Sequence, residues 1–128
     1  MLTDYEQAKV LIAEDEDTNF FVLDLFVRKS LQMNTIRAAN GIEAIEAFKS
    51  NPDIVLVLMD IKMPVLNGIE ATKKIKAINP DMPVIAITAY ALSGDEHKLR
   101  MAGCDDYISK PVQKKELIRK IEKILADK

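Results

Sequence analysis

The sequence has little cysteine, no long hydrophobic run and no marked excess of charge of either sign. Its single cysteine, Cys104, excludes an internal disulfide framework and favours a reducing compartment. No apolar run approaches the roughly 18 residues of a membrane span, and Asp4 and Glu6 stand where a signal peptide would carry positive charge. The formal charge of -2, from 18 basic and 20 acidic residues, gives no field that attracts nucleic acid or anionic lipid. We therefore expect a cytoplasmic protein that binds neither nucleic acid nor a membrane.

What the sequence does have is apolar content for one core. The chain has 128 residues, of which 48% are hydrophobic, so a core can form without metal or disulfide cross-links. A second folded domain does not fit within this length. We therefore expect one domain over residues 1–128.

Short apolar runs alternate with longer amphipathic segments along the chain. The runs predict strands at residues 10–13, 35–38, 54–59, 83–88 and 106–109. The segments between and after them predict helices that start near residues 17, 41, 68, 93 and 114, the first of them capped by Asp17 or Thr18. The apolar stripes of the second and third helices are expected to consist of Ile42, Ile45, Phe48, Ile69, Ile75 and Ile78. This alternation predicts an α/β fold, a single doubly wound parallel sheet of five strands covered on both faces.

Polar residues end four of the five predicted strands. Glu14 and Asp15 follow the first strand, and Asp60 follows the third. Thr88 ends the fourth strand, and Lys110 follows the fifth. In open sheets of this kind the ligand site lies at the carboxyl ends of the strands, where the strand order reverses. With the order 2-1-3-4-5 the first and third strands are neighbours, so the three carboxylates should converge.

Three convergent carboxylates repel one another unless a cation joins them. Magnesium, or manganese in its place, suits ligands that are all oxygen and recruits phosphate oxygens. A thiolate or imidazole metal is disfavoured because Cys104 and His97 lie away from the strand ends, and we expect His97 on the surface. Thr88 and Lys110 offer a hydroxyl and a positive charge to an anion. Together these groups make Asp60 a candidate acceptor of a phosphoryl group.

Four segments carry a resemblance to a known family. They are "LIAEDE", "VLMDIKMPVLNG", "AITAYA" and "DDYISKP", and their order and spacing resemble those of the receiver domains of two-component response regulators. The resemblance covers essentially the whole chain. It implies a flavodoxin-like fold with the strand order 2-1-3-4-5.

The resemblance implies roles for the acidic residues. Asp60 would accept a phosphoryl group from a phosphohistidine of a histidine kinase or a histidine phosphotransfer partner. The side chains of Asp15 and Asp60 and the carbonyl of Lys62 would bind magnesium, and Glu14 would act through water. Such a domain catalyses only its own phosphorylation and dephosphorylation, so we do not expect an enzyme with a separate substrate.

The resemblance also implies a switch. Thr88 would follow the new phosphoryl group, Lys110 would pair with its oxygens, and Tyr107 would rotate between exposed and buried states. The responding surface would comprise the helix at 93–102, the strand at 106–109 and the last helix. The bond between Lys110 and Pro111 is expected to be cis.

Lys62 and Tyr90 flank the place from which water would attack an aspartyl phosphate. Both side chains are long. We hypothesise that they obstruct this water and make the phosphorylated state long-lived.

Three other functions have different sequence requirements. A magnesium-dependent phosphohydrolase typically has a second aspartate two residues after the first, where this chain has Lys62. A flavin-binding module needs a loop of Ser, Thr and Gly after the first strand, whereas this chain has four acids at positions 14–17. A docking module that works without phosphorylation stays open as an alternative.

The parent architecture also has alternatives. The segments "AEDE", "TAYA" and "AGCDDYISKP" look most like the receiver of a hybrid sensor histidine kinase. The alternatives are a stand-alone regulator and a receiver cut from a DNA-binding regulator. A monomer is expected, because the helix at 93–102 is strongly polar. Lys73, Lys74 and Lys76 are expected on a solvated helix face. The last helix could present either a solvated face or a docking edge through Lys114, Lys115, Arg119, Lys120 and Lys123.

Overall fold

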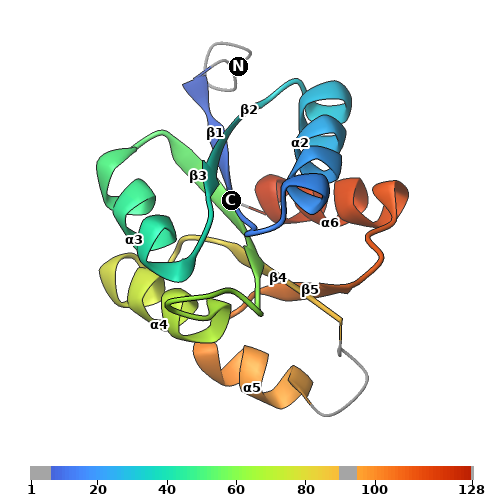
Figure 1. Cartoon of the computed structure of the whole chain (residues 1–128). Helices are drawn as coiled ribbons and strands as arrows, with labels where there is room; N and C mark the ends of the chain where they lie inside the picture. Colours follow the sequence, from blue (N-terminus) through green and yellow to red (C-terminus); the bar gives the residue numbers. More distant parts are fainter. Residues whose placement is uncertain (1–6, 90–94, 128) are drawn as a thin grey trace.

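The computed structural model describes residues 7–89 and 95–127. Strands and helices alternate along this part of the chain, and their bounds are β1 Lys9–Ala13, α2 Asp17–Leu31, β2 Asn34–Ala38, α3 Gly41–Ser50, β3 Ile54–Asp60, α4 Gly68–Ile78, β4 Val84–Thr88, α5 Asp95–Ala102, β5 Asp106–Ser109 and α6 Lys114–Ala126 (Figure 1). Each predicted strand is present, with bounds that differ by one residue at most.

All strand pairs are parallel, and the sheet has the order β2-β1-β3-β4-β5. The predicted fold class and strand order are therefore confirmed. The chain crosses from β1 to β2 on one side and then returns to place β3 on the other side of β1. The carboxyl ends of β1 and β3 thus lie side by side, with Ala13 in register with Met59.

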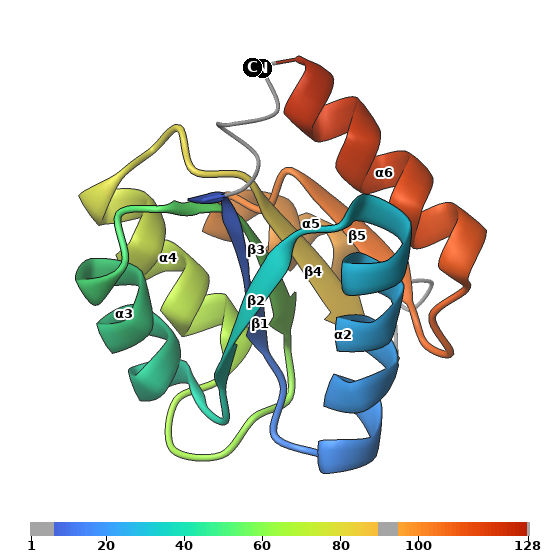
Figure 2. The same cartoon turned by 90° about the horizontal axis from the view of Figure 1, so that it is seen from above.

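Helices cover both faces of the sheet, as the apolar strands require. Figure 2 shows α2 and α6 on one face and α3 and α4 on the other. On the first face Leu23, Val27, Leu117 and Ile121 pack against alternate residues of the strands. On the second face Ala44, Ile45, Phe48 and Ile75 do the same. The two buried layers make the sheet a rigid base for the residues at its edge.

The apolar stripes of α3 and α4 differ from the prediction. Ile42 is 42% exposed and Ile78 is 49% exposed. The buried positions follow the helical spacing of three and four residues but start at a glycine in each helix, and they are Gly41, Ala44, Ile45 and Phe48 in α3 and Gly68, Ala71, Thr72 and Ile75 in α4. Small residues face the sheet because both helices begin in close contact with neighbouring backbone, which leaves the two isoleucines at the margin of the stripe.

The predicted N-cap of α2 is wrong, whereas α3 and α4 have regular caps. Asn40 and Asn67 cap α3 and α4 by accepting hydrogen bonds from the N–H groups of Glu43 and Glu70. The cap position of α2 is Glu16 instead of the predicted Asp17 or Thr18, and within the described residues its side chain makes no capping bond. Glu16 accepts a hydrogen bond from the Asn19 side chain instead.

In the described part of the chain, none of the helices combines the length and the apolar character needed to cross a membrane.

Candidate functional site

Three carboxylates meet at the carboxyl ends of β1 and β3. One carboxylate oxygen each from Glu14, Asp15 and Asp60 lies within 4.8 Å of the others. Glu14 is fully buried, Asp60 is 3% exposed and Asp15 is exposed. The predicted convergence is confirmed, and its cause is the parallel register that places Glu14 beside Asp60.

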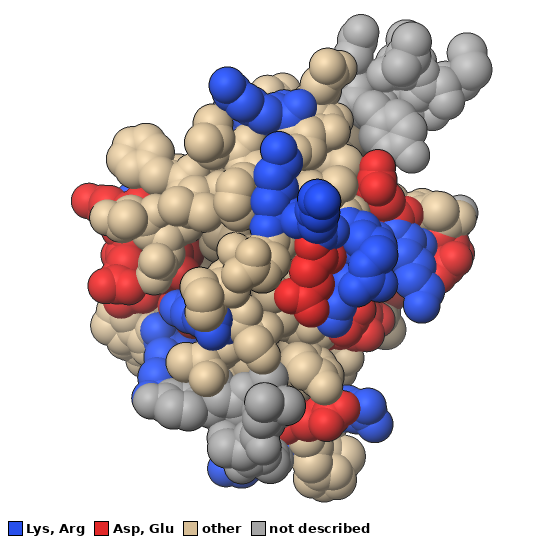
Figure 3. Space-filling model, turned by 90° about the vertical axis from the view of Figure 1, so that its right-hand side faces the viewer, with Lys and Arg blue, Asp and Glu red and all other residues tan. Residues whose placement is uncertain are grey.

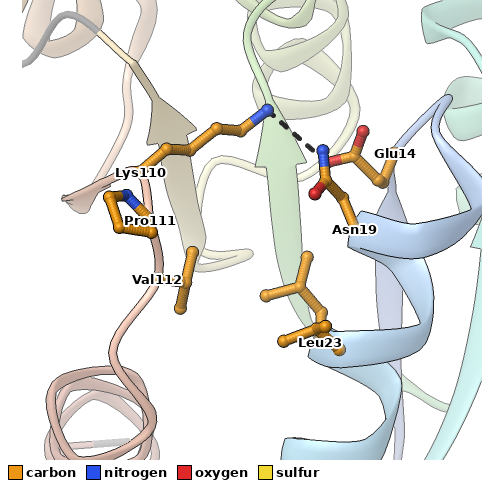
Figure 4. Close-up of a pocket in the computed structure, with 7 residues that line it drawn as sticks. Glu14, Asn19, Leu23, Lys110, Pro111 and Val112 are labelled. Atoms are coloured by element: carbon orange, nitrogen blue, oxygen red, sulfur yellow. Dashed lines mark ion pairs between the residues drawn. The ribbon is translucent and has the colours of Figure 1, made fainter.

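Lys110 brings a positive charge to this cluster. Its ammonium nitrogen lies 3.3 Å from an oxygen of Asp60. The same nitrogen lies 3.7 Å from Oε1 of Glu14 (Figure 4). The backbone N–H of Lys110 donates to the carbonyl of Thr88 at 2.8 Å, so the end of β4 holds the start of the following loop. The Lys110–Pro111 bond is cis, as the resemblance implied.

The charge of the cluster is not balanced by one lysine. Burial is the main cause that raises the pKa of Glu14 from 4.5 to about 7. The N–H of Glu16 opposes this by donating to the carboxylate, Asp60 adds to it by repulsion, and Lys110 opposes it by attraction. Among the described residues Oε1 of Glu14 has no hydrogen-bond donor. A buried acceptor without a donor, beside two further carboxylates, fits a divalent cation.

The loop after β3 contacts Asp60 and the backbone next to it. The N–H of Gly68 donates to the carbonyl of Ile61 at 2.9 Å, and the N–H of Lys62 lies 3.4 Å from Oδ1 of Asp60. Val65 in this loop has a φ of 69° and is 79% exposed. The loop therefore turns back sharply toward the end of β3, and Lys62 contacts the Asp60 carboxylate through its N–H group.

Thr88 is 4% exposed and ends β4, next to Ser109 of β5. The Lys62 side chain is exposed. Tyr90, its partner in the hypothesis of a long-lived phosphorylated state, lies outside the described residues. That hypothesis stays a prediction.

Tyr107 on β5 contacts both flanking helices. Its phenol donates a hydrogen bond to Glu96 of α5, and this bond is the main cause that raises the pKa of the phenol. The ammonium of Lys120 on α6 lies 5.4 Å from the centroid of the ring and 2.7 Å from the carbonyl of Tyr107. Lys120 also pairs with Asp106 at 2.9 Å. Lys120 is therefore held by contacts within the domain. The other four basic residues of α6 named above are exposed, and they are Lys114, Lys115, Arg119 and Lys123.

Basic and acidic side chains are interleaved on the side that carries α2 and α6 (Figure 3). A large surface of one sign is not visible in this view. The sequence left two roles open for the exposed basic residues of α6, a solvated face or a docking edge. Both roles stay predictions for Lys114, Lys115, Arg119 and Lys123.

Two further predictions are tested by side-chain surroundings. His97 is exposed, as predicted. Lys73 and Lys74 are exposed too, but the prediction was wrong for Lys76, which is 15% exposed and pairs with Asp105 at 2.8 Å. Lys76 is held there because α4 ends beside the loop before β5, and Asp105 also accepts from the N–H of Val84.

Cys104 is partly buried and packs against the core face that α3 and α4 cover. Burial is the main cause that raises the pKa of its thiol to about 11. Both observations indicate that Cys104 serves as a small, mainly apolar packing residue.

A cavity of about 410 Å³ lies between α2 and the loop that joins β5 to α6 (Figure 4). Glu14 and Lys110 line it next to the acidic cluster, and the remaining lining residues are Asn19, Val22, Leu23, Pro111 and Val112. Sequence reasoning missed Asn19 and Val112. Their only sequence signal is a position shortly after a strand end, which many residues share.

Known proteins match almost the whole chain. Residues 10–122 match the family model of the response regulator receiver domain. The polar-differentiation response regulator DivK of Brucella anthropi is 40% identical over 121 residues, which cover 92% of this chain and 96% of DivK.

Solved structures agree. The receiver domain of sensor histidine kinase PA1611 from Pseudomonas aeruginosa, crystallised with a magnesium ion coordinated in its active site cleft, has a TM-score of 0.85 and 34% identity, covering 93% of this chain and 98% of that one. The co-crystal structure of the histidine phosphotransfer protein Ypd1 and the receiver domain of Ssk1 from Saccharomyces cerevisiae contributes a match with a TM-score of 0.82 and 33% identity, covering 91% of this chain and 88% of that one.

Proposed function

The chain belongs to the family of response regulator receiver domains, the phosphoacceptors of two-component signalling, and we propose that its acceptor is Asp60. One observation carries the proposal. The nearly buried carboxylate of Asp60 ends β3 with the Lys110 ammonium at 3.3 Å and the carboxylates of Glu14 and Asp15 beside it. A lone aspartate at a strand end is usually a turn residue, but this one has the charged surroundings that phosphoryl transfer needs.

A divalent cation, Mg²⁺ or Mn²⁺, completes the proposed site. The side chains of Asp15 and Asp60 and the carbonyl of Lys62 would hold it, and Glu14 would act through a water molecule. The receiver domain of PA1611 was crystallised with magnesium in its active site cleft, which supports this choice. When bound, the cation would neutralise the charge that gathers as a phosphoryl group approaches three carboxylates.

The residues of the chain divide the transfer between them. An oxygen of Asp60 attacks phosphorus, the bond from phosphorus to the imidazole nitrogen of a phosphohistidine breaks, and the electron pair of that bond stays on the imidazole. Lys110 pairs with the phosphoryl oxygens and is already aimed at Asp60. The domain would catalyse only its own phosphorylation and dephosphorylation. In the second step water attacks phosphorus, the bond from phosphorus to the Asp60 oxygen breaks, and inorganic phosphate and the free carboxylate result, so the domain would not be an enzyme with a separate substrate.

The proposed response uses the residues next to Asp60. Phosphorylation adds roughly two negative charges at one point. Thr88 would move toward the phosphoryl group, and Tyr107 would change its orientation. Because Tyr107 contacts Glu96 and Lys120, a change in its orientation would be transmitted to α5 and α6.

The proposed partner is a histidine kinase or a histidine phosphotransfer domain. The co-crystal structure of Ypd1 with the Ssk1 receiver supports the second possibility. The parent architecture has support in both directions, since DivK is itself about one domain long whereas the PA1611 receiver is part of a sensor kinase. We retain the hybrid kinase as the proposal and the stand-alone regulator as its alternative. The monomeric state and the cytoplasmic location stay predictions.

The test is phosphorylation by acetyl phosphate with and without magnesium, measured by intact mass on the wild type and on Asp60→Asn. Asp53→Asn, at an exposed acid before β3, is the matched control. We expect one phosphoryl adduct that requires magnesium, persists in Asp53→Asn and is lost in Asp60→Asn. A folded wild type without any adduct would favour the docking module.

A further inference from the structure

Arg37 of β2 contacts the backbone of the loop that carries two of the three carboxylates. Its Nε and Nη2 each lie 3.3 Å from the carbonyl oxygen of Glu14, and Nη2 lies 3.3 Å from the carbonyl oxygen of Asp15. Its Nη1 pairs with Asp17 at 2.8 Å. All three guanidinium nitrogens therefore contact groups within residues 14–17.

One further contact fixes the guanidinium, and the sheet fixes the Arg37 backbone. The central carbon of the guanidinium lies 4.8 Å from the centroid of the Phe20 ring, a cation–π distance. The Arg37 backbone lies in β2, in register with Ile12 of β1. The side chain is only 31% exposed. Arg37 is therefore held by the sheet at one end and by α2 at the other.

The loop needs such an anchor because it is short and negatively charged. Only residues 14–16 join β1 to α2, and together with Asp17 they form a run of four acids. Repulsion between these acids and Asp60 favours arrangements in which the loop moves outward. The N–H of Glu14 is bound to Ala38, and Arg37 binds the carbonyl of the same residue from outside the cluster.

We infer that Arg37 is a positioning residue that sets the affinity of the acidic cluster for its divalent cation. Arg37 binds carbonyl oxygens and Asp17, and so leaves the carboxylate of Asp15 available as a ligand and that of Glu14 available to act through water. Lys110, in contrast, lies among the carboxylates. This inference rests on the proposed function, since it concerns the cation that the function requires.

Positioning and simple charge predict opposite results. If Arg37 acted only as a positive charge, its removal would make the site more negative and cation binding tighter. If it holds the loop, its loss lets the carboxylates of Glu14 and Asp15 move away from Asp60, and cation binding becomes weaker. Outer residues that orient metal ligands typically change metal affinity by roughly 10- to 100-fold.

The decisive variant is Arg37→Lys, which keeps the charge and loses the fork that reaches several acceptors at once. Arg28→Lys is the matched control, because Arg28 also joins α2 to β2, through Asp24 and Thr35, but contacts neither loop carbonyl. Mg²⁺ alone is titrated into each isotope-labelled protein and followed by the amide resonances of Glu14 and Asp15. We expect Arg37→Lys to bind roughly 3- to 30-fold more weakly and Arg28→Lys to match the wild type.

A second readout separates positioning from loss of fold. Phosphorylation by acetyl phosphate should be slower in Arg37→Lys when Mg²⁺ is limiting and should approach the wild-type rate when Mg²⁺ saturates. Arg37→Met, measured in about 0.5 M salt to screen the lost charge, should also bind Mg²⁺ more weakly.

Mg²⁺ affinity within twofold of the wild type in Arg37→Lys, or tighter binding in Arg37→Met, would overturn the inference while leaving the proposed function intact. A wild type that neither binds Mg²⁺ nor forms an adduct would overturn the proposed function and the inference with it.

Discussion

The backbone of Gly68 lies against the carbonyl group of Asp60 so closely that a Cβ atom on Gly68 would overlap the carbonyl oxygen. Gly68 begins α4, and its own N–H donates to the carbonyl of Ile61 at 2.9 Å. The start of this helix therefore fixes the end of β3, where the proposed acceptor lies. Any side chain at position 68 must displace Asp60 or the helix.

We expect Gly68→Ala to lower the free energy of unfolding by about 1 to 3 kcal/mol, the usual cost of overpacking. Displacement of Asp60 should also slow adduct formation from acetyl phosphate. Urea denaturation and intact mass measure the two effects. Gly103→Ala is the control, because Gly103 has a φ of 103° and lies near Lys76, so it should lose stability without a change in adduct formation. Equal adduct formation in both variants would contradict the prediction.

Val65 adopts a left-handed conformation that a β-branched residue rarely takes, with a φ of 69°. Asparagine adopts this conformation at lower cost, and the exposed valine loses few contacts when replaced. We expect Val65→Asn to raise the free energy of unfolding by about 0.5 to 1 kcal/mol, measured by urea denaturation. Val65→Thr keeps the branched Cβ and should stay near the wild type. A gain in Val65→Thr as large as that in Val65→Asn would rule out backbone strain as the cause.

The sheet and the acidic cluster could be predicted because both depend on local patterns and one topological rule. Runs such as residues 54–59 are apolar throughout, which marks a strand buried on both faces. Once the order 2-1-3-4-5 is adopted, Glu14 and Asp60 must end neighbouring strands. Sequence also indicated Lys110, since it follows the fifth strand directly.

The contacts of charged side chains could not be predicted, because their partners are distant in sequence. Lys76 was expected to be solvated, yet it pairs with Asp105, 29 residues away. Arg37 gave no signal, since its contact with Glu14 depends on the register between β1 and β2. The sequence pattern of a basic residue on a polar helix face is the same whether its side chain is solvated or forms an ion pair. Only the packing of the other elements decides between these states.

The Tyr107 phenol donates to the Glu96 carboxylate, and this bond is the main reason that its pKa is raised. We expect Glu96→Gln to lower the pKa of Tyr107, because a neutral amide stabilises the protonated phenol less. Ring chemical shifts of labelled tyrosine, followed through alkaline pH, measure the change. His97→Gln, at an exposed neighbour, should leave the titration unchanged. An unchanged Tyr107 pKa in Glu96→Gln would mean that α5 does not hold the proposed switch residue.

Glu14 makes the stability of the metal-free protein depend on pH, and the sign of this dependence follows from its pKa. Its pKa is raised from 4.5 to about 7, mainly by burial, so the folded state binds a proton that the unfolded state has released above pH 4.5. The stabilisation linked to this proton is fully present below pH 4.5 and is lost as the pH rises through 7. We therefore expect Glu14→Gln, which is neutral at every pH, to raise the melting temperature of the metal-free protein at pH 8 more than at pH 5. Glu16→Gln, at an exposed neighbour, should show no such difference.

The proton on Glu14 also competes with binding of the cation. Below pH 7 a cation that binds the ionised cluster must displace the proton of Glu14, so Mg²⁺ affinity should rise about tenfold between pH 6 and pH 8. Calorimetric titration in buffers of different ionisation enthalpy would detect the released proton at pH 6 and little release at pH 8. In Glu14→Gln the affinity should be lower and nearly independent of pH in this range. A wild-type affinity that stays flat from pH 6 to pH 8 would show that Glu14 does not carry a proton in the metal-free site.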